Sequence, residues 1–247
     1  LYPGKEYCGR VYLRDVGIEN YGICAETAFT YEKEEAKNLL PQRKTSGHKG
    51  TFGKVLLYAG SREMSGAALL CARAVLCSGA GMLKVLTEET NHTLLRTVLP
   101  EAMIATDPVK DLEWADVLVA GPGIGTSEEA KETLTGLLRA SYLPTVLDAD
   151  ALNLLAEDQE LMELVKEKAS KQPVILTPHP GEFLRLSGLT MADYQQEREK
   201  AIRTLQEQCH CVLVSKDACT LVTDGAALYL NSTGNDGMAT AGSGDVL

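Results

Sequence analysis

The feature that most constrains the fold is a regular alternation of short apolar runs and longer helical segments, which begins at Lys54. Short apolar runs that end in glycine or polar residues are typical of buried strands, and the segments between them show helical spacing of apolar residues. We expect strands at 55–59, 82–86, 117–120, 145–147, 174–177 and 212–215, helices at 65–78, 91–98, 127–140, 151–168 and 191–209, and a hairpin of strands 220–223 and 227–230 turning at Asp224-Gly225. Strands and helices that alternate in this way are joined by right-handed crossovers, so the pattern predicts a three-layer α/β/α fold with a mainly parallel sheet.

The length and charge of the chain narrow the class of protein. At 247 residues it can bury a large core, and its formal net charge of −10 argues against a nucleic-acid-binding or membrane-binding surface. No apolar run approaches the roughly 18 residues of a membrane-spanning helix, and the first residues show no signal-peptide pattern. The composition therefore predicts a cytoplasmic α/β protein.

The first 45 residues differ in character from the rest. Residues 1–30 are rich in Tyr, Gly and charged side chains, and 31–45 form a charged connector that leads to a main domain at 46–247. The chain begins in what looks like the middle of a loop and ends on the apolar pair Val246-Leu247. We therefore expect a piece of a longer protein, with the main domain cut at its carboxyl end.

The residues that follow the expected strands carry the chemistry. In a parallel α/β sheet, ligands bind beyond the carboxyl ends of the strands. Those positions hold Gly60-Ser61, Gly121-Pro122-Gly123-Ile124-Gly125, Asp148-Ala149-Asp150, Thr177-Pro178-His179-Pro180-Gly181-Glu182, Lys216-Asp217 and Gly242-Ser243-Gly244-Asp245. Glycines and unpaired charges at so many strand ends would destabilise a purely structural protein, so the pattern indicates an active site.

The last of these segments is the most informative. Glycines let the backbone approach a ligand closely, and a helix that starts after them directs free N–H groups at an anion. Asp245 would then lie beside a bound phosphate, where it could take a proton from an attacking hydroxyl. The alternative is an ordinary glycine turn with Asp245 as a helix cap.

The other segments also allow two interpretations each. Residues 121–125 do not match the dinucleotide fingerprint, because its third glycine would fall on Thr126, and they form either a tight turn or a close backbone contact with a ligand. Asp150 either caps the next helix or binds a ligand, and His179 is either structural or functional. Glu182 is a first-turn carboxylate or faces a magnesium-bound phosphate. Lys216, like Lys49 near the start of the domain, binds phosphate or is merely solvated.

Several segments together resemble one family over about 200 residues. They are His48-Lys49-Gly50-Thr51-Phe52-Gly53, Ala59-Gly60-Ser61 with Met64-Ser65-Gly66-Ala67-Ala68, the glycine run at 121–125, Asp148-Ala149-Asp150-Ala151-Leu152-Asn153, residues 177–182, and 231–247. The chain resembles the ADP/ATP-dependent NAD(P)H-hydrate dehydratases, members of the ribokinase-like superfamily. Residues 1–30 look like the tail of the NAD(P)H-hydrate epimerase domain that precedes the dehydratase in many bacterial members.

The resemblance implies a ribokinase-like fold and a repair reaction. Such an enzyme phosphorylates the ring hydroxyl of (6S)-NADHX or NADPHX, the hydrated cofactors, and the loss of phosphate restores NADH or NADPH. Bacterial fused members use ADP as the donor, and ATP serves in eukaryotic ones. Magnesium bridges the phosphates, the small molecules are the only partners implied besides further copies of the chain, and the assembly implied is a homotetramer.

The resemblance also implies roles for individual residues. Asp245 is the catalytic base. The positions that match the hydrated-dinucleotide site are Ala67, Gly123, His179 and Asp245. The positions assigned to the adenine nucleotide are Lys216, Asp217, Ala218, Cys219, Thr220, Gly242, Ser243 and Gly244. Glu182 and Asp150 are the candidates to contact magnesium through water.

The sequence departs from the family pattern in places. Ala241 and Ser243 stand where two adjacent glycines and a threonine are common, and both are small enough to leave the backbone amides available. The chain ends at Leu247, so the helix that starts near Asp245 is cut short, and we expect one face of the sheet to be left bare.

Two other functions compete with the dehydratase. A small-molecule kinase of the same superfamily, acting on a vitamin precursor or a sugar, would share Asp245 and the glycine run but release a stable phosphorylated product. A nucleotide-binding fragment without activity is the second. The Pro-His-Pro-Gly-Glu stretch at 178–182 favours the dehydratase.

Overall fold

The computed structural model of the chain describes residues 7–10, 12, 14, 17, 28–231 and 233–247. The predicted epimerase-like tail at 1–30 lies largely outside the described residues. The strands are β1 (Lys54–Tyr58), β2 (Met82–Leu86), β3 (Met103–Ile104), β4 (Val117–Ala120), β5 (Thr145–Leu147), β6 (Val174–Leu176), β7 (Val212–Ser215), β8 (Leu221–Thr223) and β9 (Leu228–Leu230). The helices are α1 (Lys33–Leu39), α2 (Ser65–Cys77), α3 (His92–Val98), α4 (Pro108–Trp114), α5 (Glu128–Ala140), α6 (Asp150–Glu157), α7 (Gln159–Ala169), α8 (Pro180–Ser187), α9 (Met191–Gln196), α10 (Arg198–Cys209) and α11 (Ser243–Val246), with short 3-10 turns η2 (Lys49–Thr51), η3 (Glu89–Asn91) and η4 (Asp236–Met238).

The described strands form a single nine-stranded sheet in the order β3-β2-β1-β4-β5-β6-β7-β8-β9. The pairs from β3 to β7 are all parallel, and β8 and β9 continue the sheet as an antiparallel hairpin. The expected mainly parallel α/β/α fold is therefore confirmed. The sheet brings the carboxyl ends of β1, β4, β5, β6 and β7 to one edge.

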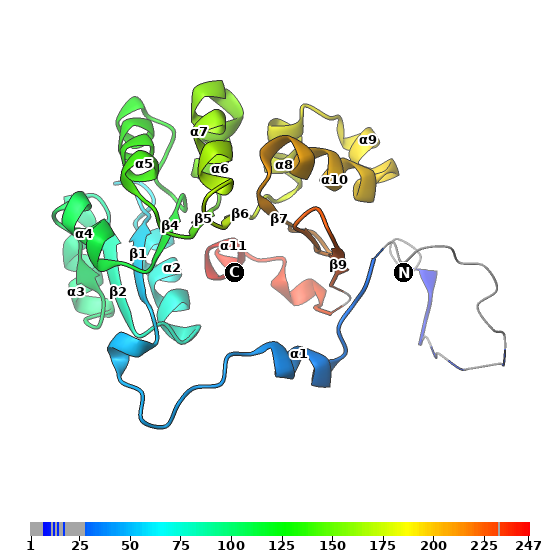
Figure 1. Cartoon of the computed structure of the whole chain (residues 1–247), viewed down its shortest axis with the longest axis horizontal. Helices are drawn as coiled ribbons and strands as arrows, with labels where there is room; N and C mark the ends of the chain where they lie inside the picture. The colour runs from blue at the N-terminus through cyan, green and yellow to red at the C-terminus, as the bar shows by residue number, and fades with distance from the viewer. Residues whose placement is uncertain (1–6, 11, 13, 15–16, 18–27, 232) are drawn as a thin grey trace.

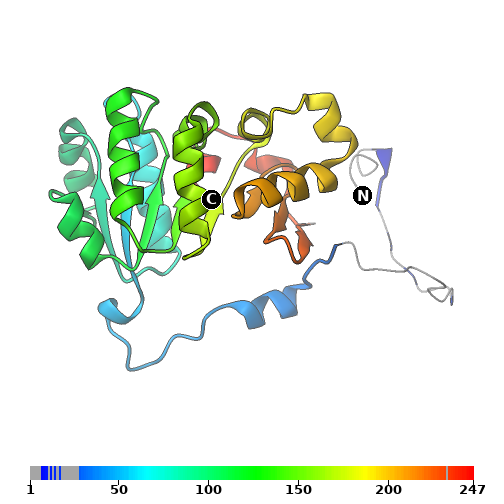
Figure 2. The same ribbon diagram turned by 45° about the horizontal axis from the view of Figure 1, so that its top comes forward.

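Alternate strand residues point to opposite faces of the sheet, and apolar side chains lie on both faces. Helices therefore cover the sheet on both sides. Leu56, Leu118 and Leu147 pack into the larger core with helices α4 to α10, whereas Leu57 and Val85 pack with α2 and α3. Figures 1 and 2 show α5 to α10 on one side of the sheet and α2 and α11 on the other.

The face that carries α2 and α11 is less well covered toward the middle of the sheet. Val146, Ile175 and Val212 are neighbours in register on this face, and all three are only half-buried. Their counterparts on the opposite face, such as Leu147 and Leu176, are fully buried. Strand residues on the α2 and α11 face are thus more exposed here than those on the opposite face.

Local sequence patterns place most elements correctly, and the differences have identifiable causes. The single helix expected at 151–168 is two helices, because Asp158 adopts an extended backbone and its side chain caps α7 through the Leu161 amide. The helix expected at 191–209 is likewise broken at Glu197, where the backbone leaves the helical region. The sequence patterns do not predict strand β3 or helices α4 and α8, because each is too short to show a clear periodicity of apolar residues.

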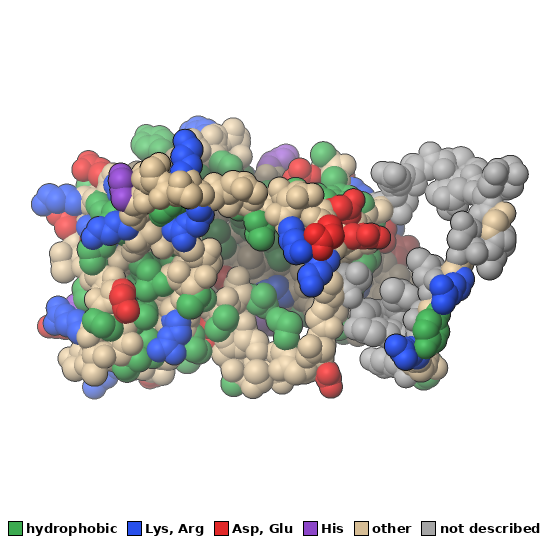
Figure 3. Space-filling view, turned by 90° about the horizontal axis from the view of Figure 1, so that it is seen from below, with side chains coloured by type: hydrophobic (Ala, Val, Ile, Leu, Met, Phe, Trp, Pro, Cys, Tyr) green, Lys and Arg blue, Asp and Glu red, His purple; other side chains and the backbone are tan. Residues whose placement is uncertain are grey.

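The connector that precedes the domain lies along its outside (Figure 1). Helix α1 buries none of its residues. Upstream of it, the backbone of Phe29 pairs with β9, and the ring of Phe29 lies 5.7 Å from that of Tyr229. On the face seen in Figure 3, acidic and basic side chains are interspersed. Among the described helices, none is long and apolar enough to span a membrane.

Candidate active site

An ion pair ties together the ends of three neighbouring strands. Asp148 follows β5 and Lys216 follows β7, and the Lys216 Nζ lies 2.7 Å from Asp148 Oδ1. Their side chains are only 14% and 16% exposed. The Lys216 amide also donates to the Pro178 carbonyl, which follows β6. The pair therefore spans β6 at the edge where parallel sheets bind ligands, and Lys216 is neither freely solvated nor directed into open space.

Asp245 is held against helix α2 by the short helix α11. The Cys71 thiol donates to the Asp245 carbonyl oxygen at 2.9 Å, and burial raises the pKa of that thiol to about 12. Gly242 precedes α11 with φ +82°, and a Cβ there would lie 2.9 Å from the Leu70 side chain. This position therefore requires glycine. Burial, followed by the negative charge of Asp148, raises the pKa of the Asp245 carboxyl above its ordinary value.

The glycine run at 121–125 makes a close backbone turn over the end of β4. A Cβ on Gly121 would lie 1.8 Å from the Asp148 carbonyl oxygen, and Gly121 has φ +131°. A Cβ on Gly123 would lie 2.7 Å from the Cβ of Ala67. The turn thus brings together Ala67 and Gly123, two of the expected substrate positions, and contacts within the protein already favour glycine at positions 121 and 123.

Asp150 fastens this turn to helix α6. Its Oδ2 accepts from the Gly125 amide at 2.9 Å and its Oδ1 accepts from Asn153 Nδ2 at 3.2 Å. The cap of α6 is Ala149, which adopts φ +49° and ψ −118°, an unfavourable backbone for a residue with a Cβ. Asp150 therefore does not cap its own helix, and its carboxylate stabilises the glycine turn instead.

His179 and Glu182 form a closed unit at the start of α8. The His179 Nδ1 accepts from the amides of Gly181 and Glu182 at 2.9 and 3.3 Å, so the ring proton of the neutral imidazole lies on Nε2. That Nε2 lies 3.1 Å from Glu182 Oε1, and Glu182 Oε2 accepts from the His179 amide at 2.9 Å. The Glu182 side chain is 5% exposed and the His179 ring is 50% exposed. Glu182 thus fixes the ring, and the ring faces the solvent side of the site.

Burial also changes the pKa of the Glu182 carboxyl. Desolvation raises the pKa of its carboxyl, and the nearby Asp148 charge adds to this effect, while the His179 amide and ring oppose it. A buried carboxylate whose two oxygens already have partners is well suited to orient a neighbour and poorly suited to hold a metal directly.

The carboxylates near the site fit magnesium only through water. In the described part of the chain, no group of three His, Cys, Asp or Glu side chains is placed to hold a metal ion. Asp150 and Glu182 already accept hydrogen bonds with both oxygens. Magnesium commonly keeps several waters and binds substrate phosphates, so this donor set fits an ion held by phosphates and water, with the carboxylates in its outer shell.

The loop from Lys216 to Leu221 is anchored by a residue that sequence reasoning missed. Arg198, the first residue of α10, donates through Nη2 to the Cys219 carbonyl at 3.0 Å, and the same nitrogen lies 3.5 Å from Asp217 Oδ2. Within the loop, Ala218 and Thr220 hydrogen-bond to Asp217. No local motif marks Arg198, because its partners lie about 20 residues away in sequence.

Lys49, the other lysine singled out in the sequence, lies elsewhere. It begins η2, immediately before the amino end of β1, and its carbonyl abuts Gly81, where a Cβ would approach to 1.7 Å. The structure therefore does not bring Lys49 to the carboxyl edge of the sheet with Asp148, Lys216 and Asp245.

Comparison with known proteins gives consistent matches. A family model described as NAD(P)H-hydrate dehydratase matches residues 55–247. A bifunctional NAD(P)H-hydrate repair enzyme of Coxiella burnetii is 39% identical over 257 residues, covering 100% of this chain and 51% of the relative. An ADP-dependent (S)-NAD(P)H-hydrate dehydratase of Neisseria meningitidis serogroup B is 41% identical over 211 residues, covering 83% of this chain and 70% of the relative. The chain spans about half the length of the bifunctional relative.

A solved structure shows the same fold. The ADP/ATP-dependent NAD(P)H-hydrate dehydratase of Bacillus subtilis, co-crystallized with ATP and Mg²⁺, superposes with a TM-score of 0.76 at 33% sequence identity. The match covers 90% of this chain and 78% of that one.

Proposed function

The chain belongs to the NAD(P)H-hydrate dehydratase family, and we propose that its site dehydrates (6S)-NADHX and NADPHX with ADP as the phosphate donor. The observation that carries the proposal is the position of Asp245, at the glycine-rich start of a helix and beside the Asp148–Lys216 pair. This arrangement supports Asp245 as a base that acts beside a bound phosphate.

Dehydration by this route avoids the departure of hydroxide, which is a poor leaving group. Asp245 accepts the proton of the ring hydroxyl as the hydroxyl oxygen attacks the terminal phosphorus of ADP, and AMP departs. The C–O bond of the phosphorylated ring then breaks. Phosphate leaves with the bonding electrons and the neighbouring ring carbon loses a proton, which restores the double bond of the dihydronicotinamide. The balance is hydrated NAD(P)H and ADP giving NAD(P)H, AMP, phosphate and one proton, which is released to solvent.

A raised pKa suits Asp245 to this task. A carboxylate whose environment disfavours its charge is a stronger base than an exposed one. Cys71 and Gly242 hold α11 against α2, so the carboxylate has a fixed position relative to the sheet.

Backbone amides supply the attraction for the transferring phosphate. The first amides of α11, around Ser243 and Gly244, carry the partial positive charge of a helix start. Lys216 adds a positive charge at the same edge, partly neutralised by Asp148. Magnesium, when bound, would reduce the negative charge of the phosphates, with Asp150 and Glu182 contacting its waters.

His179 is the group we assign to the hydrated ring end of the dinucleotide. Its half-exposed ring is held by Glu182 with the proton on Nε2. The loop from Lys216 to Leu221, braced by Arg198, is assigned to the adenine nucleotide. A homotetramer, a cytoplasmic location and an epimerase domain in the parent protein stay predictions.

The test is recovery of the near-ultraviolet absorbance of NADH from hydrated NADH, in the presence of magnesium and either ADP or ATP. We expect recovery that requires the nucleotide and releases phosphate. Asp245→Asn should abolish turnover while nucleotide binding changes by no more than a few-fold. Recovery at near-normal kcat in this variant would show that another group is the base. A stable phosphorylated product without NADH would instead indicate a small-molecule kinase.

A further inference from the structure

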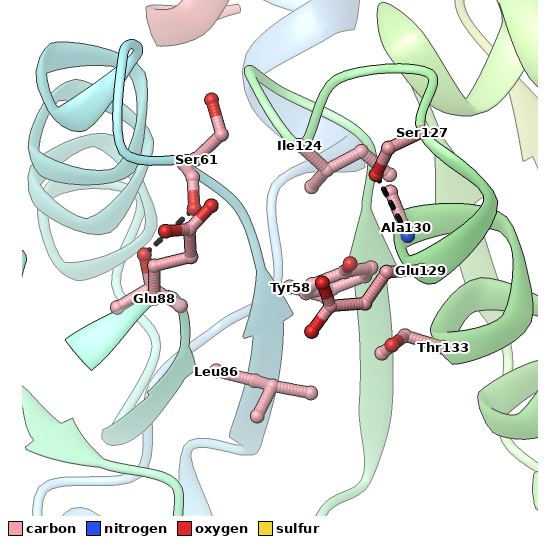
Figure 4. A pocket seen from close by; sticks show the side chains of 11 residues that line it. Tyr58, Ser61, Leu86, Glu88, Ile124, Ser127, Glu129, Ala130 and Thr133 are labelled. Atoms are coloured by element: carbon pink, nitrogen blue, oxygen red, sulfur yellow. Dashed lines mark hydrogen bonds between the residues drawn. The ribbon is translucent and has the colours of Figure 1, made fainter. Parts of the chain in front are cut away.

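A cavity of about 220 Å³ opens beside the proposed substrate site, at the carboxyl ends of β1 and β2 (Figure 4). Tyr58, Leu86 and Ile124 give it an apolar and partly aromatic surface, and helix α5 forms one wall. Pockets that bury a whole drug-sized ligand measure about 300–1,000 Å³, so this cavity suits one part of a larger molecule.

The cavity adjoins the proposed substrate site across the backbone of the glycine turn. The Ser61 amide donates to the Gly123 carbonyl, and both Ser61 and Ile124 line the cavity. Gly123 lies against Ala67 on the other side of the same turn. A dinucleotide that contacts Ala67 and Gly123 with one half would cross the carboxyl edge of the sheet and place its other half in the cavity, on the α5 side.

The charged side chains in the cavity are all acidic. Glu88 and Glu129 lie on opposite sides of it (Figure 4), and none of its lining residues is Lys, Arg or His. No ion pair of either carboxylate occurs within the described ranges. Burial raises the pKa of the Tyr58 hydroxyl, and both carboxylates add to this effect while a hydrogen bond with Thr133 opposes it. The cavity is therefore a region of negative potential, unlike a phosphate site.

Hydroxyl groups are abundant in the same cavity. The Ser127 Oγ accepts from the Ala130 amide, which leaves its proton available, and Tyr58 pairs with Thr133. Carboxylates and hydroxyls with an adjacent flat apolar surface are the groups that bind a ribose and stack on a base. An acidic side chain on the ribose 2′-hydroxyl is the usual means of selecting a dinucleotide without a 2′-phosphate.

We propose that this cavity binds the adenosine ribose of the hydrated dinucleotide, and that Glu88 and Glu129 make the site prefer hydrated NADH over hydrated NADPH. The inference rests on the proposed function. A 2′-phosphate would bring a second negative group against two carboxylates in a partly desolvated space, which is unfavourable. The unphosphorylated ribose instead donates hydrogen bonds to the same oxygens.

The experiment compares kcat/KM for hydrated NADH and hydrated NADPH in the complete native protein and in a Glu88→Gln, Glu129→Gln double variant. We expect the native protein to favour hydrated NADH by about tenfold, the order of effect expected for a like-charge contact near a protein surface. The double variant should bring the ratio close to one, mainly by lowering KM for hydrated NADPH. The matched control is Glu128→Gln on the same helix, whose side chain is 86% exposed and outside the cavity.

Each outcome decides the question. An equal preference in the native protein, or a ratio that the double variant leaves unchanged, would overturn the assignment. If neither hydrated cofactor is turned over, the proposed function fails. The cavity is then tested by calorimetry with ADP-ribose and its 2′-phosphate: tighter binding of ADP-ribose that the double variant abolishes supports the cavity, and equal binding overturns it.

Discussion

Replacement of Gly121 by alanine should destabilise the fold far more than the same change at the exposed Gly136. The new Cβ would lie 1.8 Å from the Asp148 carbonyl oxygen, and the position has φ +131°. An unfavourable backbone for a residue with a Cβ costs about 1–3 kcal/mol. Relief of a steric overlap in a packed region costs about 1–3 kcal/mol more. The free energy of unfolding should therefore fall by roughly 2–6 kcal/mol.

Thermal unfolding measures this effect directly. In a domain of this size each 1 kcal/mol shifts Tm by about 2–4 °C, so we expect Gly121→Ala to lower Tm by roughly 4–24 °C. The matched control is Gly136→Ala. Gly136 lies within α5, is exposed, and has no atom within 4 Å of a new Cβ. There alanine should stabilise the helix by about 0.5–1 kcal/mol. If the two variants had the same Tm, the contact between the glycine turn and Asp148 would not exist in solution.

Three further predictions concern the site. Because the pKa of Asp245 is raised in the folded protein, kcat/KM should fall as pH drops through a value above the ordinary carboxyl pKa. For the same reason Asp245→Asn should be more stable than the native protein at neutral pH but not in acid, which measurements of Tm across pH will show. Glu182→Gln should raise KM for the hydrated cofactor by loosening the orientation of the His179 ring, while ¹⁵N chemical shifts should show the proton still on Nε2, because the Gly181 and Glu182 amides remain; an unchanged KM would refute the positioning role. Arg198→Met should raise KM for ADP more than it lowers kcat, whereas the exposed Lys200→Met should change neither, and equal effects of the two would argue against a bracing role for Arg198.

The pH prediction for stability follows from the sign of the shift. A carboxyl with a raised folded-state pKa binds its proton more tightly in the native state than in the unfolded state. Its contribution to stability is fully present below the unfolded-state pKa and is lost as pH rises through the folded-state pKa. At neutral pH the charged Asp245 is therefore a cost to folding, which an amide of the same shape removes.

The fold could be predicted from sequence because its determinants are local. Strands such as Met82–Leu86 and Val117–Ala120 are short, mainly apolar runs in which alternate residues are fully buried, and their lengths match the prediction. Helix breaks at Asp158 and Glu197 escaped prediction because helical spacing continues across them. The break at Asp158 depends on a cap that only the packing of α7 makes favourable.

The site was predicted in part. The topology rule brings residues at strand ends together, and Asp148, His179, Lys216 and Asp245 do lie at one edge. Which groups pair could not be predicted, because Lys216 and Asp148 are 68 residues apart and nothing in either local sequence identifies the other. For the same reason the sequence allowed Asp150 to be a helix cap, whereas in the structure its Oδ2 accepts a hydrogen bond from the Gly125 amide, 25 residues upstream.

The charges of the assembled site explain why phosphate binding cannot rest on side chains. The negative charges of Asp148 and Asp150 raise the pKa of the Asp245 carboxyl, and the positive charge of Lys216 lowers it. Because Asp148 already pairs with Lys216, little of that positive charge is left for an anionic ligand. If phosphate binds as proposed, we expect its attraction to come from backbone amides at the start of α11 and from a cation that arrives with the phosphates. The same excess of carboxylate raises the pKa of Asp245, which suits the role of base that we propose for this residue.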